Sequence, residues 1–470
     1  MRIERDSLGT KAVASDAYYG IHAKRACENF PVTTRKVDEL LIRNYLKIKA
    51  AAAKANFNSH VLEEQKYELI SAACHELLFH FDNYRDEYIT PALQGGAGTS
   101  TNMNVNEVIA NKANELAGGQ KGTYTFINPN DDVNRCQSTN DTYPTAGHLT
   151  MIAKTDQLLT EVRQTNQILL ELAERYQGTL KMARTQLEDA IPTTFGKSFH
   201  AYYSLLARDI KRLEKARTAL LTVPLGGTAV GTGLNADPLY QKSVVSILAN
   251  LTDLPLKQAD DLVDGIQNMD LYVQLADAYK SLAVNLSKVS NDLRLLGSGP
   301  QAGLGELNLP KKQAGSSIMP AKVNPVIPEV VTQAAYQVIG YNTTINMAAE
   351  AGQLELNAFE PVIFTDLFEG AQLLSGALNT LRKNCLIGLT VNQKHCEQQV
   401  SQSASIATAL SPRIGYAAAS ELIKQAIREN VPLPKLLHDQ LQMTKEEIDH
   451  LYSPARLVGT NKAIRASAKA

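Results

Sequence analysis

The residues of this chain best suited to chemistry lie in one short segment, Gly315–Asn324, which reads GSSIMPAKVN. It combines two adjacent hydroxyls, a proline, one lysine and one asparagine, with few bulky side chains between them. A loop of this composition can turn tightly and direct backbone N–H groups, an amide and a cation at one small anion. The segment therefore predicts a site that holds a carboxylate and stabilises charge developing beside it. Gly, Ser and Pro are also common in ordinary surface loops, so the rest of the chain must decide between the two interpretations.

Further polar clusters are dense in hydroxyl and amide side chains. The first, Gly95–Asn106, reads GGAGTSTNMNVN and precedes a helix expected to start near Glu107; the second, Asn128–Asn140, reads NPNDDVNRCQSTN and precedes a long helix. A smaller polar element, Thr185-Gln186, lies at a break between two long helices. Loops ahead of helices bring backbone N–H groups and the positive end of the helix dipole to a ligand. Helix capping and turn formation could explain many of these residues singly, but clusters separated by long helices favour the walls of one polar pocket.

Several other kinds of site are not supported. The segment GGTAVGTG, Gly226–Gly233, lacks the preceding strand and the Gly-Lys-Ser/Thr ending of a nucleotide-binding loop. The nine histidines show no HExxH or clustered spacing, so we expect no metal site and no cofactor. There is no GxSxG motif, and Ser316 and Ser317 have no His/Asp partners in a known arrangement.

Charge and composition exclude further classes of protein. The 47 basic and 48 acidic residues give a formal net charge of −1 without a basic block, so no nucleic-acid partner is expected. No apolar run approaches the ~20 residues of a membrane span, and the charged start MRIERDSLGT is unlike a secretory signal, so no membrane association is expected. The five cysteines are scattered without CxxC spacing, which is typical of reduced thiols in a cytoplasmic protein.

Long helices are predicted from apolar residues that recur at alternating spacings of three and four, a pattern that places one apolar seam along a helix. The seams comprise Leu158, Val162, Thr165, Leu169, Leu172 and Tyr176; Phe199, Tyr203, Leu206, Ile210 and Leu213; and Leu275, Tyr279, Leu282, Leu286, Val289, Leu293 and Leu296. Two more long helices are expected by composition at Glu329–Ala351 and Asp366–Cys385. Shorter helical patterns cover Asp38–Asn56, Glu63–Asp82, Gly415–Glu429 and Thr444–Leu451.

These patterns predict an all-α protein around a central bundle of five long helices. The third seam could extend over ~35 residues, or ~50 Å, and helices of that length rarely bury all their apolar surface within one chain. We therefore expect a bundle that continues across subunits, with a monomeric all-α protein as the alternative. Three domains are predicted: 1–140, mixed helical with polar loops; 141–392, the bundle carrying the loop 315–324; and 393–470, small and helical.

The polar clusters resemble conserved regions of the aspartase/fumarase superfamily, and they occur in the expected order: GTSTNMNVNEVIAN, NPNDDVNRCQSTNDTYPT, RTQLEDAIP and GSSIMPAKVNP. The likeness runs from RIERDSLGT to SIATALSPRIGY, over essentially the whole chain. Gly98-Thr99-Ser100, Gln186 and Ala349–Leu354 resemble the branch of ammonia-lyases that acts on L-aspartate. At the position of Gly98-Thr99-Ser100, the fumarase sequence resembles Gly-Thr-Gln. At the position of Gln186, fumarases usually carry His, and this His is paired with a Glu that matches Glu329.

The resemblance implies a reversible elimination of ammonia from L-aspartate to give fumarate, through an aci-carboxylate intermediate. Three alternatives stay open: a fumarate hydratase, a lyase of a related amino dicarboxylate, and a catalytically silent helical scaffold. The resemblance also implies a homotetramer in which each pocket is built from three subunits. The protonation of the leaving group stays unassigned, because Gln186 cannot take part in a His–Glu relay.

Roles for individual residues are likewise implied by the resemblance. Ser316 is expected to be the general base. The β-carboxylate is expected to be held by Thr99, Ser138, Thr139 and Ser317. The α-carboxylate is expected at Thr185, Lys322 and Asn324, and the amino group at Asn140, Thr139 and Gln186. Backbone N–H groups of the loop and the charge of Lys322 are expected to lower the cost of a serine alkoxide.

Overall fold

The computed structural model describes residues 1–403, 410–453 and 458, and the chain divides into two compact units. Unit 1 comprises Met1–Leu159, Arg212–Ser281 and Gln337–Leu374, and unit 2 comprises Thr160–Lys211, Leu282–Tyr336 and Ser375–Ala470. The three predicted domains (1–140, 141–392 and 393–470) have other boundaries and stay a prediction. Residues 405–409 of the SIATALSPRIGY segment lie outside the described residues.

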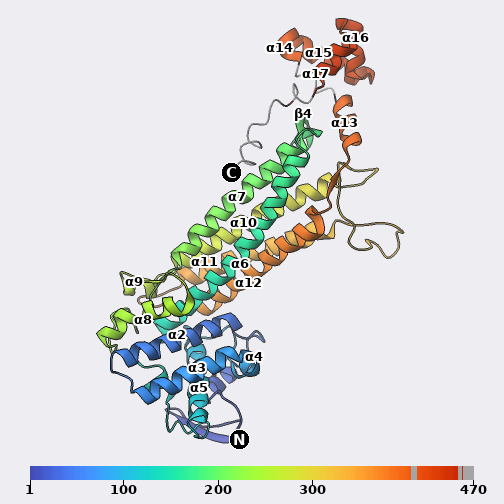
Figure 1. Cartoon of the computed structure of the whole chain (residues 1–470). Helices are drawn as coiled ribbons and strands as arrows, with labels where there is room; N and C mark the ends of the chain where they lie inside the picture. Colours follow the sequence, from blue (N-terminus) through green and yellow to red (C-terminus); the bar gives the residue numbers. More distant parts are fainter. Residues whose placement is uncertain (404–409, 454–457, 459–470) are drawn as a thin grey trace. The chain divides into compact units, whose positions relative to one another are not determined.

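Five long helices form the predicted bundle (Figure 1). They are α6 (Thr139–Arg175), α7 (Phe195–Ala219), α10 (Asp270–Leu296), α11 (Val326–Glu350) and α12 (Glu360–Leu381). Each of them contributes one part to unit 1 and the other part to unit 2. The all-α fold class is therefore confirmed.

Most residues of the apolar seams are buried as predicted, while Tyr176, Tyr203, Ile210 and Leu296 are half-buried. Leu158, Leu275, Leu282 and Leu293 have no exposed surface, because the spacing of three and four keeps them on one face of their helices. The helix of the third seam, α10, is 27 residues long, shorter than the expected ~35. It ends at Leu296, immediately before Gly297, which is a favoured residue after a helix C-terminus.

The N-terminal part of unit 1 packs short helices around α5. The antiparallel pair β1 (Arg2–Asp6) and β2 (Gly9–Val13) leads into these helices, with Arg2 opposite Val13. The helices are α1 (Ile21–Asn29), α2 (Glu39–Asn58), α3 (Glu64–Phe79), α4 (Phe81–Tyr84), the 3₁₀ turn η1 (Arg85–Glu87), α5 (Thr99–Leu116) and the π-helical turn η2 (Pro129–Val133). The predicted helices at Asp38–Asn56 and Glu63–Asp82 are thus confirmed as α2 and α3.

The helix expected to start near Glu107 begins eight residues earlier, at Thr99, so this expectation was wrong. Most of the polar cluster lies inside α5 and is buried there. Tertiary hydrogen bonds explain how Asn is tolerated in this helix: Asn104 accepts from the Ile89 N–H and donates to the Glu87 carbonyl, both over 2.9 Å. Such contacts outweigh the poor helix propensity of Asn.

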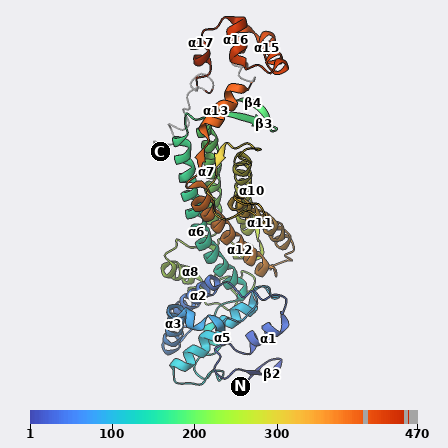
Figure 2. The same cartoon turned by 90° about the vertical axis from the view of Figure 1, so that its right-hand side faces the viewer.

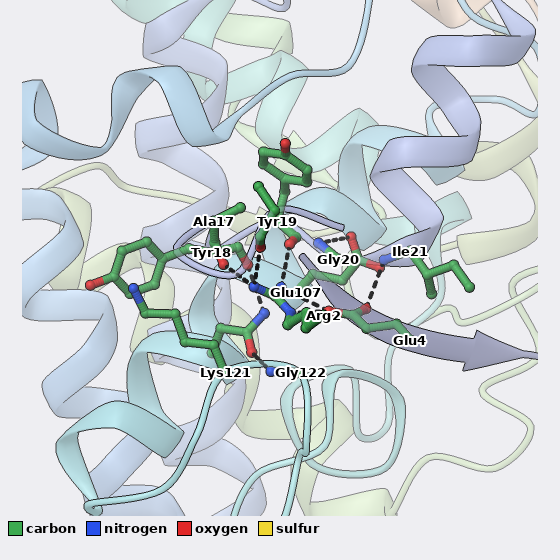
Figure 3. A network of polar contacts seen from close by, with 12 residues as sticks. Arg2, Glu4, Ala17, Tyr18, Tyr19, Gly20, Ile21, Glu107, Lys121 and Gly122 are labelled. Carbon is green, nitrogen blue, oxygen red and sulfur yellow. Dashed lines mark hydrogen bonds and ion pairs between the residues drawn. The ribbon is translucent and has the colours of Figure 1, made fainter. Parts of the chain in front are cut away.

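Two buried carboxylates cap the start of α1, which has no side-chain cap of its own (Figure 3). Glu107 accepts hydrogen bonds from the backbone N–H groups of Gly20 at 2.9 Å and His22 at 2.8 Å. Glu4 accepts from the N–H of Ile21 at 2.8 Å. Residue 20 must be glycine, because a Cβ there would lie 2.7 Å from the Glu107 carboxylate. The N–H groups that a helix start leaves unpaired are thereby satisfied by side chains of α5 and β1.

The remaining elements of unit 1 lie between α7 and α10. They are β5 (Thr222–Val223), α8 (Pro238–Thr252), β6 (Lys257–Gln258), which pairs in parallel with β5, and α9 (Leu262–Gln267). Helix α8 packs on α2 and carries an Asp237 cap that accepts from the Leu239 N–H. The glycine-rich segment Gly226–Gly233 forms the turns between β5 and α8.

Unit 2 contains the hairpin β3 (Leu180–Thr185) and β4 (Glu188–Thr194), which lies beside α13 (Figures 1 and 2). Its other elements are β7 (Leu307–Asn308), the π-helical turn η3 (Arg382–Leu386), β8 (Thr390–Val391), α13 (Gln393–Gln402), α14 (Ser411–Ile414), α15 (Tyr416–Glu429), α16 (Leu433–Leu441) and α17 (Lys445–Leu451). A small core joins Met182 of β3 to the last helices through Leu422, Leu437 and Leu451. The predicted helices near Gly415–Glu429 and Thr444–Leu451 are confirmed as α15 and α17. Within the described part of the chain, no helix is both long enough and apolar enough to cross a membrane.

Candidate active site

The loop Gly315–Asn324 curls back on itself ahead of α11. The Gly315 N–H donates to the Lys322 carbonyl, and the Asn324 side chain donates to the Gly315 carbonyl, both over 2.7 Å. A Cβ at position 315 would lie 2.7 Å from the Asn324 nitrogen, so this closure requires glycine. The loop surrounds a hollow of about 350 Å³ whose lining includes Ser316, Ser317 and Lys322. The compact turn expected from GSSIMPAKVN is therefore formed.

Ser316 receives two backbone hydrogen bonds inside this loop. Its Oγ accepts from the N–H of Ile318 at 3.2 Å and of Met319 at 2.9 Å. Because both donors point at one oxygen, they favour negative charge on it and lower the cost of an alkoxide. The sequence predicts that backbone N–H groups of this loop lower the cost of a serine alkoxide. In the structure these groups belong to residues 318 and 319, because the N–H of Gly315 closes the loop.

Thr185 and Gln186 lie at the tip of the β3–β4 hairpin and are exposed. Gln186 and Leu187 form its two-residue turn with φ angles of +57° and +68°, a conformation that matches the twist of paired strands. Strand β3 of the hairpin is held by the fully buried Glu306, which pairs with Lys181 at 3.0 Å and with Arg184 at 2.5 Å. Paired buried charges at this position fix the strand that presents Thr185.

Thr99 is the first residue of α5, and a tight turn leads into it. Gly98 has φ +84°, and a Cβ on it would lie 2.4 Å from the ring of Tyr143. The turn is closed by the Thr99 N–H, which donates to the Gly96 carbonyl at 2.9 Å. The hydroxyl of Thr99 is therefore placed at the positive end of the α5 dipole, where an anion is favoured.

The start of α6 presents Ser138, Thr139 and Asn140 together. Ser138 accepts from the Asn140 N–H at 3.2 Å, and its own N–H donates to Asp141 at 3.0 Å, which is a capping arrangement. Asn140 donates its side-chain N–H to the Ala229 carbonyl at 2.7 Å. Thr139 is nearly buried, and its Oγ1 accepts from the Asn102 side chain at 3.0 Å.

The buried Asp141 connects this helix start to the glycine-rich segment. Its second oxygen accepts from the N–H groups of Gly226 at 3.1 Å and Thr228 at 3.0 Å. Burial raises the pKa of Asp141 to about 6, although the backbone hydrogen bonds act in the opposite direction. The segment that resembled a nucleotide loop therefore has a structural role, which is to hold the first turn of α6.

A set of residues beside Thr139 was missed by the sequence analysis. Lys49 of α2 is fully buried, and its Nζ donates to Asn102 at 2.7 Å and to Asn134 and Gln137 at 3.0 Å. A lysine between Ile48 and a run of alanines on an amphipathic helix is usually read as exposed, so the sequence gives little sign of this burial. Only the density of amides in the neighbouring clusters pointed to a polar network.

The expected site residues are divided between the two units. Unit 1 contains Thr99, Ser138, Thr139 and Asn140, and unit 2 contains Thr185, Gln186, Ser316, Ser317, Lys322 and Asn324. In unit 1, the Asn102 bond joins α5 to Thr139 at the start of α6. In unit 2, the loop closure joins Gly315, next to the serine pair, to Lys322 and Asn324. That both groups meet in one pocket stays a prediction.

Comparison with known proteins identifies the relatives of this chain. Residues 9–340 match the family described as Lyase, and residues 406–459 match the one described as Fumarase C C-terminus. An aspartate ammonia-lyase of Bacillus subtilis (strain 168) is 44% identical over 453 residues, covering 96% of this chain and 95% of the relative. An aspartate ammonia-lyase of Escherichia coli (strain K12) is 44% identical over 460 residues, covering 97% of this chain and 96% of the relative.

Solved structures show the same fold. A fumarate lyase:delta crystallin from Brucella melitensis superposes with a TM-score of 0.94 at 41% identity, over 98% of this chain and 100% of that one. A class II fumarase from Schistosoma mansoni superposes with a TM-score of 0.92 at 31% identity, over 96% of this chain and 98% of that one. Both likenesses extend over nearly the whole chain.

Proposed function

This chain belongs to the lyase family of the aspartase/fumarase superfamily, and from that membership we propose that it is an aspartate ammonia-lyase. It eliminates ammonia from L-aspartate to give fumarate, and it catalyses the reverse addition. The observation that carries the proposal is the identity of 44% to aspartate ammonia-lyases over nearly the full length of both chains. The geometry of the loop 315–324 and of the start of α6 supports it.

The general base in this proposal is Ser316. As an alkoxide it takes a proton from the carbon beside the β-carboxylate of L-aspartate, and the electron pair moves into that carboxylate to form the aci-carboxylate. The N–H groups of Ile318 and Met319 lower the cost of the alkoxide. The pair then returns to form the carbon–carbon double bond as the carbon–nitrogen bond breaks, and the amine leaves.

The remaining residues hold the two carboxylates and the amine. The neutral donors Thr99, Ser138, Thr139 and Ser317 receive the β-carboxylate and become stronger partners as its charge grows. The α-carboxylate is bound by Thr185, Lys322 and Asn324. The amine is surrounded by Asn140, Thr139 and Gln186. Asn140 fits this role because one amide proton is bonded to the Ala229 carbonyl, which turns its Oδ1 into the atom that accepts from an ammonium group.

The working enzyme is proposed to be a cytoplasmic homotetramer whose active sites each draw residues from three subunits. Its partners are small dicarboxylates, and neither nucleic acid nor membrane takes part. The exposed face of α11 supports the assembly. Val330, Tyr336 and Met347 on that helix are 47%, 62% and 69% exposed, and large apolar side chains exposed among polar ones are suited to a subunit interface.

The test of the proposed function is turnover of L-aspartate by the purified protein, followed by the absorbance of fumarate. L-Malate, a methylated aspartate and an N-substituted aspartate are assayed in parallel. We expect fumarate from L-aspartate and no comparable rate from L-malate. Turnover of L-malate alone would make the protein a fumarate hydratase. Turnover of neither substrate would favour the alternative of a catalytically silent helical scaffold.

A further inference from the structure

Lys49 is a fully buried lysine whose hydrogen-bond partners are all neutral. Its side chain has no exposed surface, and its Nζ donates to the side-chain oxygens of Asn102, Asn134 and Gln137. Asp141 acts on it only through space, because that carboxylate accepts three backbone N–H groups instead. An ammonium group without a bonded counterion is costly to bury. An anion that arrives from outside the chain would therefore stabilise the charged form of Lys49.

The three partners of Lys49 lie on the two segments that carry candidate site residues. Asn102 is in the first turn of α5, which begins at Thr99. Asn134 and Gln137 belong to the turn that leads into Ser138 at the start of α6. The Asn134 oxygen also accepts from Asn102 at 3.2 Å and from Asn106 at 3.1 Å. One ammonium group thus holds together the starts of both helices.

The hydrogen bond from Lys49 also determines the orientation of the Asn102 side-chain amide. An ammonium group can only donate, so the Asn102 oxygen must face it, at 2.7 Å. The Asn102 nitrogen must then face the other way, where it donates to Thr139 Oγ1 at 3.0 Å. Because the Thr139 oxygen accepts this hydrogen bond, the Thr139 hydroxyl proton is available for donation to another acceptor. The chain of bonds from Lys49 through Asn102 therefore makes Thr139 a hydrogen-bond donor.

We propose that Lys49 is a positioning residue that, through Asn102, directs the Thr139 hydroxyl proton at a bound dicarboxylate and offsets that ligand's charge. This inference rests on the proposed function, in which Thr139 contacts the substrate. Lys49 itself does not touch the substrate. It acts by fixing a neutral donor and by supplying a positive charge behind it, where charge on the aci-carboxylate develops.

The properties of the lysine agree with this role. Burial lowers the pKa of Lys49 to about 7, while the negative charge of Asp141 on α6 acts to raise it. A dianion bound at Thr139 raises the pKa of Lys49 in the same way as this carboxylate. The charged form of the lysine is thus strengthened when substrate is present.

The decisive variant is Asn102→Asp. An aspartate at this position keeps the bond to Lys49 but loses the one that Asn102 donates to the Asn134 oxygen. That oxygen still accepts from Lys49 and Asn106, which continue to connect α2, α5 and the turn before α6. It has no N–H to donate to Thr139, whose proton then turns back toward the carboxylate and away from the substrate. We expect kcat/KM on L-aspartate to fall about 10- to 100-fold, by analogy with the loss seen when groups that orient metal-binding side chains are removed. The assembly and the Tm should stay close to those of the unmodified protein.

A double-mutant cycle with Thr139→Val separates positioning from a general structural effect. If Asn102 acts through Thr139, Asn102→Asp should cost little more in a Thr139→Val background. The same full loss in both backgrounds, or activity of Asn102→Asp within about threefold of normal, would overturn the inference. Lys49→Met should show the same coupling to Thr139→Val. Where that variant does not fold, the Asn102→Asp cycle decides alone.

Two controls complete the test. Lys54→Met, on the same helix α2, removes a lysine that lies over the rings of Phe57 and Tyr67 and should leave kcat/KM unchanged. Succinate binding by calorimetry is measured on every variant. If the unmodified protein binds succinate but does not turn over L-aspartate, the proposed function fails. The double-mutant cycle then still measures the coupling between Asn102 and Thr139 through succinate binding. Additive losses of binding, or no binding by any variant, would contradict the role of Lys49.

Discussion

At the scale of single residues, the candidate chemistry depends on where hydrogen-bond donors point. Ser316 has two backbone N–H donors directed at its Oγ, and Thr139 has one amide donor directed at its Oγ1. The effects differ, because the first favours an alkoxide and the second leaves a hydroxyl proton free to donate. Two hydroxyl side chains are thereby suited to opposite tasks, one as a base and one as a donor.

Ser316→Ala should abolish turnover while leaving the fold intact. The Ser316 hydroxyl only accepts within the loop, and the closing bonds of Gly315 and Asn324 do not depend on it. Loss of a general base is expected to lower kcat about 10³-fold or more. The rate of fumarate formation measures this, with succinate binding as the check that the pocket survives. Activity within tenfold of normal would remove Ser316 from the role of base.

Lys322→Ala should mainly weaken substrate binding. An α-carboxylate left without its cation in a closed, dry pocket costs roughly 2–4 kcal/mol, which raises KM about 30-fold or more. The matched control is Lys311→Ala, which removes another exposed lysine ahead of the same loop. Initial rates at varied L-aspartate concentration distinguish the two. An unchanged KM for Lys322→Ala would contradict the proposed contact.

At the scale of elements, the sequence predicts the long helices better than the segments between them. The bundle helices were found because their leucines repeat with a helical spacing, which depends only on local sequence. The start of α5 was missed because its buried asparagines are paired by residues of a preceding turn. The β3–β4 hairpin has no glycine in its turn and depends on Glu306, more than a hundred residues away. Lys49 was missed for the same reason, since its partners lie far along the chain.

The cap of α1 gives a pH-dependent prediction for stability. Burial raises the pKa of Glu107 to about 7, despite hydrogen bonds from the N–H groups of His22, Ala23 and Gly20. Because the ordinary value is 4.5, the folded protein binds this proton more tightly than the unfolded chain. The contribution of Glu107 to the free energy of unfolding therefore falls as pH rises from about 4.5 to about 7, by roughly 3 kcal/mol, and is constant above that.

Glu107→Gln removes this titration and serves as the reference. Urea unfolding of both proteins between pH 5 and 8 gives the difference in their free energies of unfolding at each pH. We expect the unmodified protein to lose stability relative to Glu107→Gln up to about pH 7, after which the difference is level. A difference that is independent of pH, or that grows in favour of the unmodified protein, would contradict a raised pKa. The amide should also lower the Tm at every pH, because its NH₂ meets backbone donors at the start of α1.

At the scale of the whole molecule, exposed apolar side chains on the serine loop favour an assembled enzyme. Ile318 and Met319 at the tip of the serine loop are 85% and 47% exposed, and apolar side chains in that position are suited to contact with another subunit. The proposal that each pocket is shared between subunits follows from these placements together with membership of the superfamily.

Subunit complementation tests the shared pocket. Ser316→Ala and Thr139→Val chains carrying different tags are co-expressed, and tetramers containing both tags are purified. If the serine loop and Thr139 of one pocket come from different subunits, some pockets in mixed tetramers receive an intact copy of both. Random mixing of equal amounts gives about a quarter of the pockets in this state. We therefore expect about a quarter of normal activity from the mixture, although each variant alone is nearly inactive. Mixed tetramers with no more activity than either parent would place both residues of a pocket in one chain.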